Sequence, residues 1–212
     1  MITLSGHAAT LDERPLGADV DLRQIGPYHG YAEQVRRLCA LEHRGARASI
    51  AGRSIDGQPV VALELGAAGA ARVAVLLAGI HPIEWIGVEV GLATLELLLE
   101  RPPADLRVIA FPLINVDGYR RVERDLRRTR RRFVRGNARG VDLNRNWPVH
   151  FRQRRGPTSL LAGWNHGGTH AMSEPEVAAV VQRLDAEARA ARITRAMSLH
   201  SIGRKVLYPY GG

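Results

Sequence analysis

Three apolar-rich runs, separated by helical segments, constrain the fold of this chain most strongly. The runs cover Val73–Ile80, Leu106–Ile114 and Ile193–Leu199. The first two are typical of strands buried on both faces of a sheet, and the third is read as a strand. Between them, apolar spacing and terminal signals predict helices over Trp85–Leu99 and Glu174–Arg192. The alternation of strands and helices predicts a three-layer α/β domain with helices on both faces of a mixed, mostly parallel central sheet.

The remaining segments complete a single domain. The helical period of Tyr31–Glu42 predicts a first helix, and the runs Ala48–Ile55 and Val60–Leu65, joined by an Asp-Gly turn, predict a hairpin. We expect an irregular middle between Ile114 and Ser173, with Ser173 capping the last helix. The sequence has no internal repeat or long linker. We therefore expect an N-terminal extension over residues 1–27 and one domain over residues 28–212.

The net charge of +9 comes mostly from one segment. Residues 120–139 contain ten arginines and two acidic residues, Glu123 and Asp125, which gives a local charge of +8. Such a cluster binds polyanions without sequence preference, so a polyanion-binding module is one alternative function. The segment has no regular aromatic interleaving and no groove-reading motif, and nucleic acid is therefore not the expected partner.

The sequence also indicates in which cellular compartment the protein works. The longest apolar stretch, Ala70–Ile80, is interrupted by Arg72 and is far shorter than the roughly 20 residues of a membrane helix. The first 20 residues contain no secretory signal. Cys39 is the one cysteine, and its amphipathic surroundings indicate a buried, inert thiol. We therefore expect no membrane partner and a cytoplasmic location.

Polar side chains follow each of these three strands. His81 and Glu84 come after the first, the turn Asn115–Tyr119 after the second, and His200 after the third. Ligands in α/β domains collect at the carboxyl ends of such strands. Two imidazoles and one carboxylate form a zinc ligand set that leaves a fourth position for water. A lone His-x-x-Glu pair is weak evidence, and the segment Gly140–Pro148 strengthens it, because a purely structural loop would not require this run of polar and aromatic residues.

A second histidine pair, His166 and His170, has a spacing of four residues. Gly167 and Gly168 lie between the two histidines, which favours a loop over a rigid helix face. We do not expect this pair to bind metal.

Five segments in this order resemble the zinc metallocarboxypeptidases of peptidase family M14. The resemblance runs from about Tyr28 to the last residue. The segments are His81–Gly87, Asn115–Tyr119, Gly140–Pro148, Ser173–Glu176, and His200–Ser201 with Leu207–Gly211.

The resemblance implies a zinc carboxypeptidase fold and assigns roles to individual residues. His81, Glu84 and His200 would hold one Zn²⁺ per chain. Arg127 would polarise the scissile carbonyl, and Asn144 with Arg145 would bind the free C-terminal carboxylate of a peptide. Amidase and deacylase relatives share these zinc ligands, so an acylated amino acid is the alternative substrate. The positive charge near Arg127 favours acidic substrates.

One departure from the family affects activity. The resemblance places the catalytic glutamate and the last strands of the sheet well beyond the third ligand, and the twelve residues after His200 contain no glutamate. We therefore expect either a truncated product or a zinc-binding pseudoenzyme with little peptidase activity. Because the next strand is missing, we also expect residues 193–199 to form an exposed edge that promotes self-association.

Overall fold

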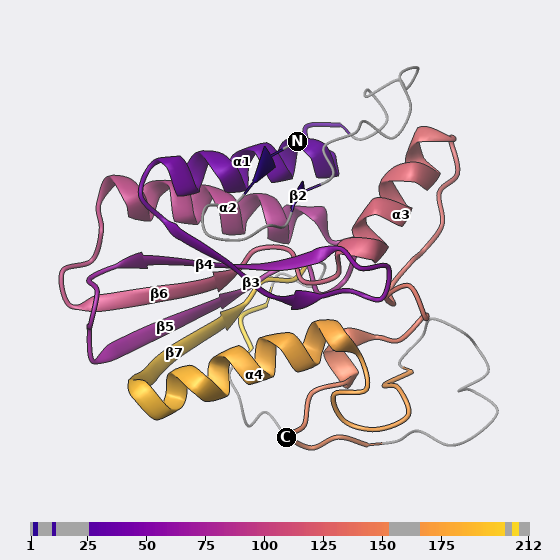
Figure 1. Cartoon of the computed structure of the whole chain (residues 1–212). Helices are drawn as coiled ribbons and strands as arrows, with labels where there is room; N and C mark the ends of the chain where they lie inside the picture. The colour runs from indigo at the N-terminus through magenta and orange to yellow at the C-terminus, as the bar shows by residue number, and fades with distance from the viewer. Residues whose placement is uncertain (1, 4–9, 12–25, 153–165, 202–204, 208–212) are drawn as a thin grey trace.

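A mixed sheet of five strands forms the middle layer of the molecule (Figure 1). The computed structural model describes residues 2–3, 10–11, 26–152, 166–201 and 205–207. The strands are in the order β3-β4-β6-β5-β7; β4 is antiparallel to β3 and β6, and β5 is parallel to β6 and β7. Their bounds are β3 Arg47–Arg53, β4 Pro59–Gly66, β5 Arg72–Leu77, β6 Leu106–Phe111 and β7 Arg192–Ser198.

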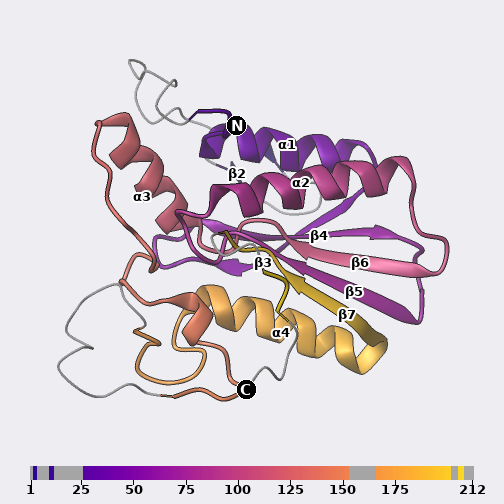
Figure 2. The ribbon, with the colours of Figure 1, turned by 180° about the vertical axis from the view of Figure 1, so that it is seen from behind.

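Helices cover both faces of this sheet, which confirms the predicted three layers. Helices α1 (Tyr31–His43) and α2 (Trp85–Glu100) lie on one face, and α4 (Pro175–Ala190) lies on the other (Figures 1 and 2). Each face has its own apolar core. Leu63 and Leu92 belong to the core under α1 and α2, whereas Ile109 and Val177 belong to the core under α4.

The predicted hairpin is confirmed, with one irregularity. Strands β3 and β4 are antiparallel, and their register shifts between Ile50 and Gly52. A Cβ atom on Gly52 would lie 2.5 Å from the Cβ of Ala179 in α4. Glycine at this bulge therefore lets α4 approach the sheet closely.

The expectation of irregular structure after Ile114 is wrong over residues 116–127, which form helix α3 (Val116–Arg127). The Asn115 side chain caps this helix by accepting a hydrogen bond from the Gly118 N–H at 3.1 Å. The apolar residues of α3, Val116, Tyr119, Val122 and Leu126, recur every three or four residues, and the first three are buried. This helical period and the Asn115 cap before the Asp-Gly pair are the signals that the expectation missed. A short 3₁₀ turn, η2 (Leu143–Arg145), follows later in the same region.

The predicted cap of α4 is also corrected. The capping residue is Glu174, and no side chain caps the helix. Ser173 Oγ instead donates to Glu174 Oε1 at 2.8 Å and accepts from Asn146 Nδ2 at 2.9 Å. Ser173 thus joins α4 to the segment that contains η2.

Two very short strands in the N-terminal extension were not expected from the sequence. β1 (Ile2–Thr3) pairs with β2 (Thr10–Leu11) in an antiparallel arrangement. The rest of residues 1–25, and residues 208–211 of the last motif, lie outside the described part. Cys39 is buried, as predicted. Among the described residues, no helix has the length and apolar character needed to cross a membrane.

Candidate metal centre

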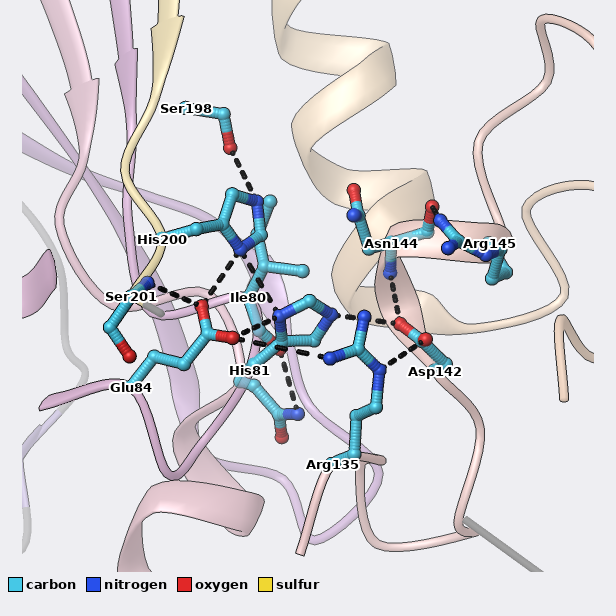
Figure 3. Close-up of polar contacts among 11 residues, drawn as sticks. Ile80, His81, Glu84, Arg135, Asp142, Asn144, Arg145, Ser198, His200 and Ser201 are labelled. Atoms are coloured by element: carbon cyan, nitrogen blue, oxygen red, sulfur yellow. Dashed lines mark hydrogen bonds and ion pairs between the residues drawn. The ribbon is translucent and has the colours of Figure 1, made fainter. Parts of the chain in front are cut away.

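Three side chains meet where the parallel strands end (Figure 3). His81 lies shortly after β5, Glu84 is the N-cap of α2, and His200 follows β7. Glu84 lies between the imidazoles: its Oε1 is 2.9 Å from His81 Nδ1 and its Oε2 is 2.8 Å from His200 Nδ1. The two Nδ1 atoms are 3.1 Å apart. The predicted ligand set therefore converges on one point.

The donor set fits a zinc ion. One ligand atom from each residue lies within 4.8 Å of the other two, and the observed separations of 2.8–3.1 Å approach the about 3.3 Å between ligand atoms around tetrahedral zinc. His81 and Glu84 are buried, with 3% and 6% of their surfaces exposed. In the described part of the chain, this is the one group of three such residues close enough to share an ion.

The local electrostatics favour a cation here. Burial acts to raise the pKa of Glu84, but hydrogen bonds from His200 and His81 lower it far below its usual value. The backbone N–H of Ser201 adds a third hydrogen bond to Glu84, at 3.1 Å. Burial acts to lower the pKa of His81, but Asp142 and Glu84 raise it overall. The centre thus carries an ionised carboxylate that lies within hydrogen-bond distance of both imidazoles, where a divalent metal could replace the shared protons.

Asp142 orients His81 and was not among the predicted site residues. Its Oδ1 is 3.1 Å from His81 Nε2, so a proton on Nε2 leaves Nδ1 free to face the other ligands. Asp142 is completely buried, and hydrogen bonds from His81 and Arg135 lower its pKa against the effect of burial. The sequence offered one signal for this role: Asp142 lies two residues before Asn144, inside the segment Gly140–Pro148 that resembles the family.

Asp142 also fixes an arginine at the centre. Arg135 Nε donates to Asp142 Oδ2 at 2.8 Å, and Arg135 Nη1 lies 4.0 Å from Glu84 Oε1 (Figure 3). The structure does not bring Arg127 to this place. Arg127 is the last residue of α3, where its guanidinium donates to Glu123 Oε1 at 2.6 and 2.9 Å.

Asn144 and Arg145 lie on η2, on the opposite side of His81 from Ser201 (Figure 3). They line a hollow of about 210 Å³ together with Trp147, Val149, His150, Phe151 and Arg152. The Arg145 side chain is exposed and donates to the Asn144 carbonyl at 3.3 Å. A guanidinium placed in this way can bind a carboxylate that enters the hollow.

The family model described as "Zinc carboxypeptidase" (Peptidase M14) matches residues 35–212. The chain belongs to this family. Mouse carboxypeptidase A6 is 33% identical over 173 residues, which are 75% of this chain and 39% of that protein. A zinc carboxypeptidase A 1 from Anopheles gambiae is 30% identical over 206 residues, which are 90% of this chain and 45% of that protein.

Solved structures of zinc carboxypeptidases agree with the fold. Bovine thrombin-activatable fibrinolysis inhibitor, in complex with tick carboxypeptidase inhibitor, matches with a TM-score of 0.72 and 25% identity over 86% of this chain and 64% of that chain. These matches confirm the family and the fold expected from the five motifs. The chain spans less than half the length of the curated relatives named here.

The second histidine pair lies apart from this centre. His166 and His170 line another hollow, of about 300 Å³, with Arg139, Ser173 and Glu174. The Nδ1 atom of His170 lies 2.9 Å from the carbonyl of Ala171. The loop structure expected from Gly167 and Gly168 is observed, since neither residue lies in a helix or strand.

Proposed function

We propose that this chain is the zinc-binding part of a metallocarboxypeptidase that removes C-terminal residues from peptides. The observation that carries the proposal is the convergence of His81, Glu84 and His200 in a member of the zinc carboxypeptidase family. These three residues would hold one zinc ion, which supplies Lewis acidity to the reacting carbonyl group.

Asn144 and Arg145 support a preference for a free C-terminus. Both residues follow closely after Asp142, which contacts His81, and the exposed Arg145 guanidinium can pair with a carboxylate through two hydrogen bonds. Bulky residues such as Trp147 and Phe151 line the same hollow as Arg145, so a C-terminal side chain would lie against an apolar wall.

Arg135 takes the role first assigned to Arg127. Its guanidinium reaches the ligand set while Asp142 fixes its orientation. A fixed cation beside the reacting carbonyl stabilises the negative charge that develops on the oxygen, which is worth about 10²-fold or more in rate. Arg127, held by Glu123 at the end of α3, is a structural residue in this arrangement.

Two alternatives keep the same metal centre. The first is a zinc-binding pseudoenzyme. Among the described residues at the centre, Glu84 already contacts the two imidazoles, and Asp142 already contacts His81 and Arg135. Neither carboxylate is therefore free to act as the proton acceptor. A missing proton acceptor lowers a hydrolytic rate by about 10²- to 10⁴-fold. The second is an amidase or deacylase that acts on acylated amino acids.

Steady-state hydrolysis by the zinc-loaded chain tests these options. The substrates are N-blocked dipeptides with a free C-terminus, the same dipeptides as C-terminal amides, and N-acyl amino acids. We expect hydrolysis of the N-blocked dipeptides with a free C-terminus only, a fall in kcat/KM of about 100-fold for Arg135→Gln, and little change for Arg127→Gln.

Four results would contradict the proposal or one of its residue assignments. Equal cleavage of the amides would remove the C-terminal preference, and faster cleavage of the N-acyl amino acids would favour the deacylase. No cleavage of any substrate, with zinc bound at one ion per chain, would favour the pseudoenzyme. A loss of activity in Arg127→Gln alone would restore the original assignment.

A further inference from the structure

The two imidazoles of the metal centre differ in how firmly they are held. The side chain of His81 is 2% exposed, and its two ring nitrogens face the carboxylates of Glu84 and Asp142. The side chain of His200 is 30% exposed. Its Nδ1 faces Glu84, while its Nε2 points away from the other ligands toward Ser198, whose Oγ is 3.2 Å away (Figure 3). Among the described residues, Ser198 is the one side chain in hydrogen-bond contact with this nitrogen.

Strand β7 fixes the position of Ser198. Ser198 is the last residue of β7 and pairs with Leu77 of β5. The next backbone N–H, from Leu199, donates to the Leu77 carbonyl at 2.8 Å, and Leu199 packs against the core under α1 and α2. Side chains two residues apart in an extended chain lie on the same side. This pairing therefore places the Ser198 hydroxyl beside the ring of His200.

The hydroxyl group of Ser198 suits both states of this imidazole, because a hydroxyl can donate or accept a hydrogen bond. A histidine that binds metal through Nδ1 carries its ring proton on Nε2, which can then donate to Ser198 Oγ. Without metal, a proton on Nδ1 can donate to Glu84 Oε2 at 2.8 Å, and the hydroxyl can donate to Nε2. Ser198 can therefore hold the ring of His200 in one orientation in both states.

We propose that Ser198 is a positioning residue that holds His200 with Nδ1 toward the metal centre and thereby raises the affinity of the centre for zinc. This inference rests on the proposed function, which assigns a zinc ion to His81, Glu84 and His200. Groups that hold the outer nitrogen of a histidine ligand are typically worth about 10- to 100-fold in metal affinity. Ser198 is exposed, and water competes for the contact there, so we expect the lower end of this range.

Zinc affinity tests the proposal without requiring catalysis. Competition with a chromophoric chelator at one fixed pH gives the affinity of the native chain and of its variants. Ser198→Ala removes the hydroxyl and should weaken zinc binding by about tenfold. Ser198→Thr keeps a hydroxyl at the same position and should bind zinc nearly as tightly as the native chain. Recovery with threonine ties the effect to the hydrogen bond.

Thr194→Val is the matched control. Thr194 lies on the same strand, six residues before His200, and its Oγ1 donates to the Val73 carbonyl at 3.2 Å. Like Ser198→Ala, Thr194→Val removes one hydroxyl from β7. We expect it to lower stability in urea and to leave the zinc affinity unchanged, so it separates a general weakening of the strand from the loss of a contact to the ligand.

Exchange of the imidazole proton gives a readout that a merely structural role would not change. In the zinc-loaded native chain, the Nε2–H of His200 should exchange slowly with water because Ser198 Oγ accepts it. Exchange should become faster in Ser198→Ala and stay slow in Ser198→Thr and Thr194→Val. Proton NMR of the imidazole N–H region measures this exchange.

Three results would each overturn the proposal: an unchanged zinc affinity in Ser198→Ala, an equal loss of affinity in Thr194→Val, or no recovery in Ser198→Thr. The dipeptide assay separates this inference from the proposed function. If zinc affinity depends on Ser198 and the zinc-loaded chain cleaves no substrate, the proposed function fails and the positioning role stands. If the native chain cleaves the dipeptides and its zinc affinity does not depend on Ser198, only the positioning role fails.

Discussion

Glu123 joins two helices through one buried carboxylate. Its Oε2 accepts the backbone N–H of Tyr31, the first residue of α1, at 2.8 Å, and its Oε1 accepts the Arg127 guanidinium. Gly30, the N-cap of α1, makes room for this contact, and α1 has no side-chain cap of its own. Glu123 therefore caps α1 from α3, which explains why Arg127 is held away from the metal centre.

A side chain at position 30 should disrupt this arrangement. A Cβ on Gly30 would lie 2.4 Å from Glu123 Oε1, so Gly30→Ala must displace the carboxylate and is expected to cost about 1–3 kcal/mol of unfolding free energy. Urea unfolding measures the cost. In the background of Glu123→Ala the clash is absent, so the cost of Gly30→Ala should shrink there; an unchanged cost in both backgrounds would contradict this account.

Between elements, Glu64 is the centre of an ion network that joins the sheet to α4. Glu64 on β4 binds Arg107 on β6 at 3.1 Å, Arg47 on β3 at 3.2 Å, and Arg183 on α4. Glu187 on α4 pairs with both Arg107 and Arg183. Burial acts to raise the pKa of Glu64, but hydrogen bonds from Arg183 and Arg107 lower it below its usual value of 4.5.

The direction of this shift predicts a pH-dependent contribution to stability. Because the folded-state pKa of Glu64 is depressed, its contribution is fully present above about pH 4.5 and is lost as the pH falls through the lower folded-state value. Glu64→Gln should therefore cost about 1–3 kcal/mol at pH 7 and progressively less below pH 4.5. Denaturant unfolding at pH 7 and pH 3 measures this.

An exposed ion pair provides the control. Glu33 pairs with Arg36 on the surface of α1, and Glu33→Gln should cost less than about 0.5 kcal/mol at either pH. A Glu64→Gln cost that stays constant between pH 7 and pH 3 would show that packing, not charge, carries the effect.

The last strand has the edge position expected from the sequence. Within the described residues, β7 pairs only with β5 and ends the order of the sheet. Met197 is 60% exposed, and Ala196 is exposed as well. Arg192 and Arg195 are the charged residues along the strand.

This edge should cause the 212-residue chain to self-associate. Unpaired backbone groups and exposed apolar side chains favour pairing with a second copy, and a lysine at Ala196 should oppose it. Light scattering should show a mass that rises with concentration for the native sequence and falls in Ala196→Lys. A stable monomer of the native sequence at tens of micromolar, with cooperative unfolding, would contradict the prediction.

At the scale of the whole molecule, most of the fold and the ligand set could be predicted from the sequence. The buried strands contain continuous apolar runs, and the helices that pack on them contain periodic apolar residues. Both patterns can be recognised within a short stretch of sequence. His81, Glu84 and His200 could be placed because each comes just after the end of a strand or at the start of a helix, and parallel strands end at a shared edge.

The choice between two arginines shows where such reasoning stops. Arg127 and Arg135 lie in one arginine-rich segment, and sequence spacing alone does not say which of them reaches the centre. The choice depends on where α3 ends and on which carboxylate each guanidinium meets, Glu123 for Arg127 and Asp142 for Arg135. Helix α3 was not expected from the sequence, and Asp142 was not among the predicted site residues. The division of the chain at residue 27 stays a prediction.

The zinc content of purified variants tests the central claim most directly. The native chain should hold one zinc ion, and His81→Ala, Glu84→Ala and His200→Ala should each hold almost none, because two protein ligands bind the ion too weakly. His170→Ala, outside the centre, should keep one ion per chain. Metal analysis by mass spectrometry after removal of free zinc gives the stoichiometry. Unchanged zinc in His200→Ala would contradict the ligand set on which the proposed function depends.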